Sequence, residues 1–295
     1  PDRPDMIQEI YDGGIDQFDK DEWITFYKHV GQKLGKPFKP EKKKGTIFMD
    51  TYGLQALWHM KKFGTTQKQI AIAASKNHFH GSLNEKAQYQ FEVSVEDVLQ
   101  DREVSYPLTR SMCAPIGDGA AAAIICSKKG LKLFTKEVQK KAIKIKSSIL
   151  SGGKYRALDE PGLSRVAAQK AYKQADINQK DIDILEIHDA TSFCEIYQLE
   201  MLGFCDEGKG GRFVEEGSTS LGGKLPVNLS GGLVSKGHPV GATGLSMVHE
   251  LSIQLKGEAK KRQSEEHKYA LAENGGGVIG FEEAACSVII LESPF

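Results

Sequence analysis

Hydrophobic positions recur at helical spacing in two neighbouring segments of the first third of the chain. Residues 52–63 and 66–76 place apolar side chains three and four positions apart, with Gly64 between the segments and threonine available as a cap. The pattern predicts two short helices with their apolar side chains in a core. His78 and His80 follow the second segment. Their spacing is too close, and too isolated from other ligand types, to suggest a metal site, and we expect both in a loop.

Short apolar runs bounded by glycine or polar residues indicate strands. Residues 117–126 read Gly-Asp-Gly-Ala-Ala-Ala-Ala-Ile-Ile-Cys, which predicts a strand buried on both faces. A second strand begins near Lys144, and a helix over 163–175 leads to a third strand over 182–187. Strand, helix and strand in succession are typical of a parallel sheet, so the pattern indicates the α/β class.

The rest of the chain continues this alternation. In chain order we expect a helix, a short strand, a long helix and two final strands, over residues 193–202, 225–229, 239–255, 269–273 and 286–291. A glycine-rich loop separates the last two strands.

Composition narrows the function classes. The 295 residues are 40% hydrophobic, and 39 Lys plus Arg balance 39 Asp plus Glu, so no net charge favours nucleic acid or an anionic membrane. No apolar run reaches the length of a membrane span. The five cysteines form no Cys-x-x-Cys pair, which argues against a disulfide framework and a metal site and favours the reducing cytoplasm.

One histidine stands out by its surroundings. His238 lies between two glycine-rich runs within residues 228–244, and Pro239 after it suits the first position of a helix. Such a histidine is presented to a ligand. The positive end of the helix dipole is expected to lower its proton affinity and keep the imidazole neutral.

Three segments, in their order along the chain, resemble the motifs of the thiolase family. They are His188-Asp-Ala-Thr-Ser-Phe193, the glycine-flanked segment 228–244, and Asn274-Gly-Gly-Gly277. The flanking sequence, such as residues 197–203, resembles the sterol-carrier-protein branch of the family. The resemblance covers residues 48–293 and implies a layered αβαβα architecture with two similar halves.

The resemblance also implies a division of the chain. We expect a charged loop or insertion over 1–47, the remainder of the first half with its loop-domain helices over 48–130, and a complete C-terminal domain over 140–295. Thiolases carry a nucleophilic cysteine in the first half, and no cysteine precedes Cys113 here. We therefore expect the nucleophile segment to be absent from this chain.

The resemblance assigns roles to individual residues. His238 stands where thiolases have the histidine that activates the nucleophile and donates to the thioester oxygen. His188 occupies a position at the oxyanion site, and Asn274 and Gly275 lie at a second oxyanion site. Coenzyme A and substrate are expected to contact the residues beside these, Ser235, Lys236, Gly237 and Gly276.

The proton carrier departs from the family pattern. The acid/base cysteine that ordinary thiolases place before the glycine loop is absent, and Glu273-Asn274 stands there. The sterol-carrier branch places a cysteine in the earlier motif, where this chain has Ala190. Cys194, about one helical turn further on, and Glu273 are the first candidates, with Asp189 and Tyr197 as rival proton carriers.

The family implies an acyl-CoA C-acyltransferase, which transfers acyl groups other than amino-acyl groups and cleaves or forms a β-ketoacyl-CoA. Coenzyme A would be a substrate, with no covalently bound cofactor. Bulky aromatic or steroid acyl groups fit, with benzoylsuccinyl-CoA as one candidate. The alternatives are a retro-aldolase for β-hydroxyacyl-CoA with a zinc-ribbon/OB-fold partner subunit, and a noncatalytic lipid carrier. We expect at least a homodimer.

Overall fold

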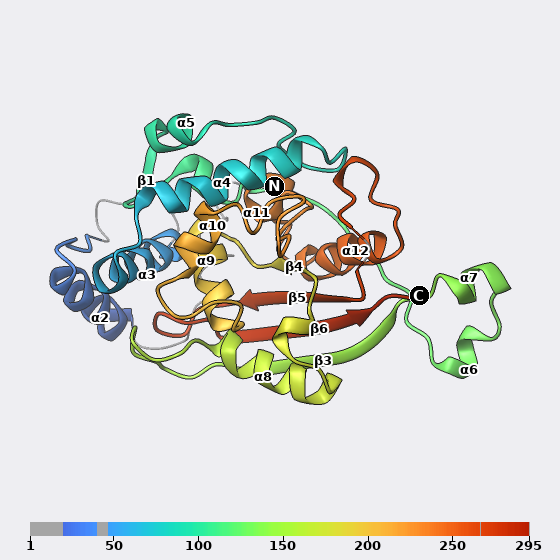
Figure 1. Ribbon diagram of the computed structural model, residues 1–295. Coiled ribbons are helices and arrows are strands. Elements are labelled where there is room, and N and C mark those ends of the chain that lie inside the picture. Colours follow the sequence, from blue (N-terminus) through green and yellow to red (C-terminus); the bar gives the residue numbers. More distant parts are fainter. Residues whose placement is uncertain (1–19, 40–46, 266, 295) are drawn as a thin grey trace.

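The computed structural model describes residues 20–39, 47–265 and 267–294. Its centre is a four-stranded sheet with the spatial order β3 (Lys144–Gly152), β6 (Ala285–Glu292), β5 (Tyr269–Gly276) and β4 (Ile184–Ile187) (Figure 1). β6 is antiparallel to both of its neighbours, and β5 is parallel to β4. The α/β class is therefore confirmed, with a mixed sheet where the sequence predicts a parallel one.

The helix predicted over 163–175 is confirmed as α8 (Leu163–Ala175). It connects β3 to β4, which run in the same direction, but β6 and β5 lie between these two strands. The strand–helix–strand signal thus gave the direction of the strands correctly. Their adjacency was set by the two later strands, which enter the middle of the sheet.

Alternating side chains of the sheet face two different helices. Leu271, Val288 and Ile290 lie in the larger apolar cluster, which includes α8. Ala270 and Ala272 lie in a second cluster with α12 (Thr243–Leu255). A strand turns successive side chains to opposite faces, so each position on β5 is assigned to either the α8 side or the α12 side.

The helices predicted in the first third are α3 (Ile47–Phe63) and α4 (Gln67–Ser82). Thr66 caps α4 through a capping box with Gln69. The expected loop at His78 and His80 is wrong, because both residues lie in α4 and are buried. His80 is held by the backbone, with Nδ1 near the carbonyl of Asn228 at 3.1 Å and Nε2 accepting from the Leu221 amide.

Residues 20–33 were expected within a charged loop, and they form α2 (Lys20–Lys33) instead. Tyr27 anchors this helix, since its buried ring stacks on Phe281 at 4.3 Å between centroids and its hydroxyl lies 2.6 Å from Thr51 Oγ1. Aromatic packing thus stabilises a helix whose surface carries charge. Residues 1–19 and 40–46 of the expected loop lie outside the described residues.

The strand predicted over 117–126 is not present. This segment is extended and exposed, with 87% of Ile124 and 75% of Ile125 accessible to solvent. A buried strand needs partners on both sides, and no described residue pairs with this one. Beyond it, α6 (Lys128–Leu131) and α7 (Lys136–Lys140) stand apart from the body of the protein (Figure 1).

Two other predicted elements are shorter in the structure. The strand over 225–229 is reduced to a single bridge between Val227 and Leu185. The helix predicted from Pro239 begins at Thr243, after a turn. The remaining α-helices and strands are α5 (Val95–Gln100), β1 (Glu103–Ser105), β2 (Leu108–Thr109), α9 (Ser192–Met201), α10 (Gly210–Glu215) and α11 (Gly232–Lys236), and short 3-10 helices lie at Arg110–Met112, Gln179–Asp181 and Lys260–Arg262.

Across the described ranges, each helix is too short or too polar to cross a membrane.

The capping box of α4 gives a direct test of this part of the fold. Replacing Thr66 with Ala removes the side-chain acceptor for the Gln69 amide, and we expect the free energy of unfolding to fall by about 1 kcal/mol. Thr66→Ser keeps a hydroxyl and should retain most of that stability. Urea denaturation of both variants would contradict the assignment if they lost equal stability.

Candidate active site

The first histidine of the site follows β4. His188 is only 5% exposed, and its backbone N–H donates to Glu273 Oε2 at 3.1 Å. Glu273 lies on β5, in parallel register with Ile187 at the end of β4. The carboxyl end of a parallel strand is where α/β proteins commonly assemble a site, and the Glu273 contact fixes the chain at that point.

The carboxylate of Asp189 holds the glycine loop against β4. Its Oδ1 accepts from the Leu233 amide at 2.6 Å, and its Oδ2 accepts from Asn77 Nδ2 at 2.8 Å. Gly232 lies so close that a Cβ there would be 2.3 Å from Oδ2, and its φ is +59°. Only glycine fits this position, because any side chain would displace the carboxylate.

The loop brings the second histidine beside the first. The rings of His188 and His238 are 5.2 Å apart between centroids, at 74° to each other. His238 Nδ1 lies 2.8 Å from Thr243 Oγ1, and that hydroxyl donates its own proton to the Pro239 carbonyl. We assign the Nδ1 proton to His238 on this basis, which leaves the lone pair on Nε2 for proton transfer.

Burial keeps both imidazoles neutral. It lowers the pKa of His188 to about 3, with a further contribution from His238, and it lowers the pKa of His238 to about 4, with a further contribution from Lys236. The sequence predicts a neutral His238, but for a different reason. His238 precedes a turn and not the first turn of α12, so burial replaces the expected helix dipole as the cause.

Asn274 lies on the same side of the sheet as α12. Its side-chain nitrogen would be 3.7 Å from a Cβ at Gly244, and its Oδ1 is buried without a hydrogen-bond partner. Gly276, two residues on, is exposed and has open space beside it. The structure thus leaves an amide oxygen and an accessible stretch of backbone at the end of β5.

Gly275 has a different neighbour from the one expected. A Cβ on this residue would lie 2.0 Å from Glu283 Oε1, so the missing side chain makes room for a carboxylate of the same chain. No sequence pattern indicates Glu283 as this neighbour, because the turn between β5 and β6 brings it back over the strand.

Three of the residues expected to bind coenzyme A or substrate shape the loop. Ser235 is buried and donates to the carbonyl of Tyr89 at 3.0 Å. The Lys236 amine donates to Ser246 at 3.0 Å and lies 3.8 Å from Glu186. Gly237 adopts a φ of +107° that favours glycine. These contacts fix the backbone before His238. They also leave little of the Ser235 and Lys236 side chains accessible to a ligand.

Neither of the two acid/base candidates, Glu273 and Cys194, lies beside Asn274 on the face of the sheet that packs against α12. Glu273 faces α8, and burial raises its pKa to about 7. Cys194 is buried in the first turn of α9, with its sulfur 3.4 Å from Thr191 Oγ1, and burial raises its pKa to about 12. Glu273 reaches His188 only through the backbone, so it positions the histidine.

A buried polar network supports the site and was missed from the sequence. Lys76 pairs with Glu195 at 2.8 Å, and Asn77 donates both to Glu195 at 3.0 Å and to Asp189. The sequence shows Lys76 only as the last residue of a predicted helix and Asn77 only as the polar residue after it. Their role depends on α4 crossing the end of β4, which no local pattern reveals.

The lowered pKa of His188 predicts a pH dependence of stability. In the unfolded chain His188 binds a proton below a pH of about 6.5, whereas in the folded protein its pKa is about 3. The free energy of unfolding therefore decreases as the pH is lowered from about 6.5 toward about 3. Between pH 7 and pH 5 we expect the wild type to lose about 2 kcal/mol more unfolding free energy than His188→Asn. Denaturant unfolding at both pH values measures this, with the exposed His29→Asn as control. Parallel losses in wild type and His188→Asn would contradict the burial of a neutral imidazole.

Comparison with known proteins gives relatives over most of the chain. The chain is 38% identical to an acetyl-CoA acetyltransferase of Methanothermobacter thermautotrophicus over 245 residues, with 81% of this chain and 63% of that protein covered. It is 39% identical to human sterol carrier protein 2, covering 80% of this chain and 46% of that protein. It is 32% identical to the benzoylsuccinyl-CoA thiolase subunit BbsB of Thauera aromatica, covering 75% and 58%. The chain therefore spans about half to two thirds of the length of these relatives.

Solved structures share the fold. The Ltp2-ChsH2(DUF35) aldolase superposes with a TM-score of 0.70 at 20% identity, covering 95% of this chain and 69% of that one. A monomeric SCP2-thiolase-like protein of Mycobacterium smegmatis superposes with a TM-score of 0.59. The family profile described as thiolase C-terminal domain-like matches residues 161–292, which include both histidines and the glycine loop. The chain belongs to the thiolase superfamily, in its sterol-carrier-protein-type branch.

Proposed function

We propose that this site binds the thioester group of an acyl-CoA, in an acyl-CoA C-acyltransferase that cleaves or forms a β-ketoacyl-CoA. The observation that carries the proposal is the contact between the neutral rings of His188 and His238, just beyond the carboxyl end of β4. Cleavage or formation of a bond next to a thioester develops negative charge on the carbonyl oxygen. Preorganised donors in a buried site stabilise that charge better than water does.

His238 would act twice in the reaction, and His188 would help to form an oxyanion site. Nε2 of His238 takes a proton from the attacking thiol, because Nδ1 already donates to Thr243. The imidazolium that results then donates to the thioester oxygen. His188 and the backbone near Gly275 and Gly276 complete the two oxyanion sites, with Asn274 as the polar side chain beside them.

The thiol that this reaction requires is not evident among the cysteines of the chain. Burial raises the pKa of Cys113, Cys194 and Cys205 to about 12 and that of Cys286 still further, so these four thiols stay protonated near neutral pH. Cys126 lies in the exposed segment before α6.

This observation also favours a second candidate, a retro-aldolase for β-hydroxyacyl-CoA. Retro-aldol cleavage needs the oxyanion donors and a base but forms no acyl-enzyme. In this case we propose a zinc-ribbon/OB-fold partner, as the Ltp2 aldolase is found with a ChsH2(DUF35) subunit. A noncatalytic lipid carrier would leave the buried histidine pair and the unpartnered Asn274 oxygen without a role.

The relatives and the exposed surface suggest the acyl group and the assembly. Similarity to a benzoylsuccinyl-CoA thiolase subunit and to sterol carrier protein 2 supports a bulky aromatic or steroid acyl group. The pocket lined by Trp58, Phe193, Tyr197 and Phe281 has a volume of only about 20 Å³ and is too small to hold such a group. The exposed Ile124 and Ile125, together with Leu150 on the outermost strand, favour at least a homodimer. Five free cysteines suit the reducing cytoplasm.

His238→Ala tests the central assignment. Loss of this base and donor should reduce the turnover of the full-length protein about a hundred- to a thousandfold. The exposed His249 on α12 offers a matched histidine variant, His249→Ala, whose turnover should stay near that of the wild type. A His238→Ala protein that kept more than a tenth of wild-type turnover would exclude the proposed role.

The reaction class can be decided by withholding free coenzyme A from the full-length protein. A thiolase accumulates a labelled acyl-enzyme under these conditions, because transfer to coenzyme A completes its cycle. We expect this species, together with coenzyme-A-dependent cleavage of a β-ketoacyl-CoA. Cleavage of a β-hydroxyacyl-CoA without coenzyme A and without a trapped intermediate would establish the aldolase instead.

A further inference from the structure

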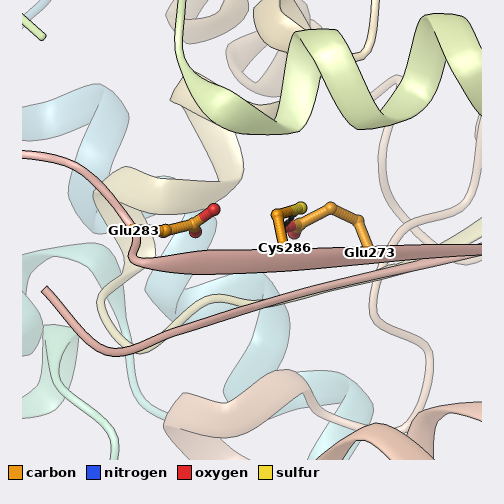
Figure 2. A group of neighbouring side chains, drawn as sticks. All are labelled: Glu273, Glu283 and Cys286. Atoms are coloured by element: carbon orange, nitrogen blue, oxygen red, sulfur yellow. Dashed lines mark hydrogen bonds between the residues drawn. The ribbon is translucent and has the colours of Figure 1, made fainter. Parts of the chain in front are cut away.

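Two carboxylates and a thiol meet on the α8 side of the sheet. Glu273 on β5 and Cys286 on β6 place Oε1 and Sγ 3.4 Å apart, and Glu283 reaches toward them from the turn before β6 (Figure 2). The donor atoms of the three residues all lie within 4.8 Å of one another. Glu273 and Cys286 are fully buried, so bulk solvent does not reach them.

This cluster has acceptors and no balancing cation. The charges acting on Glu273 and Glu283 come from other carboxyls, and in the described residues neither forms an ion pair with lysine or arginine. Glu283 Oε2 is buried and has no hydrogen-bond partner. Buried carboxylates without a counter-charge are costly, so either protons or a bound cation must neutralise them.

A fourth side chain, that of Gln198, lies against the cluster and favours a cation over protons. Gln198 on α9 is 3% exposed, and its Nε2 donates to Glu283 Oε1 at 3.2 Å. The Oε1 of the same amide is buried without a donor, and turning the amide over would place this unsatisfied acceptor where Nε2 now meets Glu283. A proton on the carboxyls would satisfy part of this set, whereas a metal ion would engage the thiolate, both carboxylates and the amide oxygen.

We propose that Glu273, Glu283, Cys286 and the amide oxygen of Gln198 form a binding site for a divalent transition-metal ion of the zinc type. Zinc accepts thiolate and carboxylate ligands in tetrahedral geometry, with its ligand distances placing sulfur and oxygen about 3.6 Å apart. The 3.4 Å between Cys286 Sγ and Glu273 Oε1 is close to this value. Binding releases the thiol proton to solvent and draws the side chain of Glu283 inward.

The site is structural and separate from the histidine pair. Four protein donors close the coordination shell, and Glu273 faces α8 while Asn274 faces α12. Through Glu273, the ion would fix the carboxylate that holds the His188 amide. Sequence spacing does not predict such a site, because Glu273 and Cys286 are 13 positions apart and are brought together by strand pairing.

Metal uptake by the full-length protein tests the proposal. After chelator treatment and dialysis, the protein should bind about one equivalent of Zn²⁺, and saturating Zn²⁺ should raise its melting temperature. Co²⁺ should bind in the same place and give the charge-transfer band of a thiolate ligand. Cys286→Ser should abolish that band, and Glu283→Gln should weaken Co²⁺ binding at least tenfold.

Cys205→Ser provides the matched control, since Cys205 lies outside the cluster, and this variant should keep the cobalt band and the Zn²⁺ stoichiometry. Wild-type protein that binds no stoichiometric Zn²⁺ and shows no thermal shift would overturn the proposal and leave a protonated cluster. A cobalt band that persists in Cys286→Ser would overturn it as well. These readouts do not involve turnover, so they are independent of the proposed reaction.

Discussion

The buried carboxylate of Asp189 is the contact on which the geometry of the site depends. It joins three parts of the chain that are distant in sequence: the end of β4, the first turn of α11 and the middle of α4. Both donors are buried, so removing the carboxylate would leave the Leu233 amide without this acceptor and Asn77 with only its bond to Glu195. The spacing of His188 and His238 follows from this junction, because one histidine precedes Asp189 and the other ends the loop that Asp189 holds.

Alternating side chains of β5 place two different sets of polar groups on opposite faces of the sheet. Asn274 shares the side that packs on α12, near the glycines that follow His238, whereas Glu273 and Gly275 face α8 together with Cys286. Adjacent residues therefore serve different purposes. The α12 side carries the neutral amide of Asn274, which we propose for an oxyanion site, and the α8 side holds buried carboxyls and a thiol.

Local patterns predicted the elements that carry their own signals. Helix 163–175 has helical spacing, α4 follows a threonine that can cap it, and the last two strands are short apolar runs, so all were identified. The strand over 117–126 was predicted from composition alone, and it lacks the pairing partners that a strand requires. α2 was not predicted, because it is stabilised by the stacking of Tyr27 on Phe281, which lies 254 positions later in the chain. The motif histidines could be identified from the sequence, but Asn77 and Glu283 enter through tertiary contacts that no spacing encodes.

The location of the thioester oxygen tests the central claim most directly. A crystal structure of the full-length protein with a nonhydrolysable acyl-CoA analogue would show it. We predict that the carbonyl oxygen lies within about 2.7–3.1 Å of a ring nitrogen of His188 or His238, the distance of an oxyanion donor. An analogue bound with its carbonyl oxygen away from both rings would contradict the account.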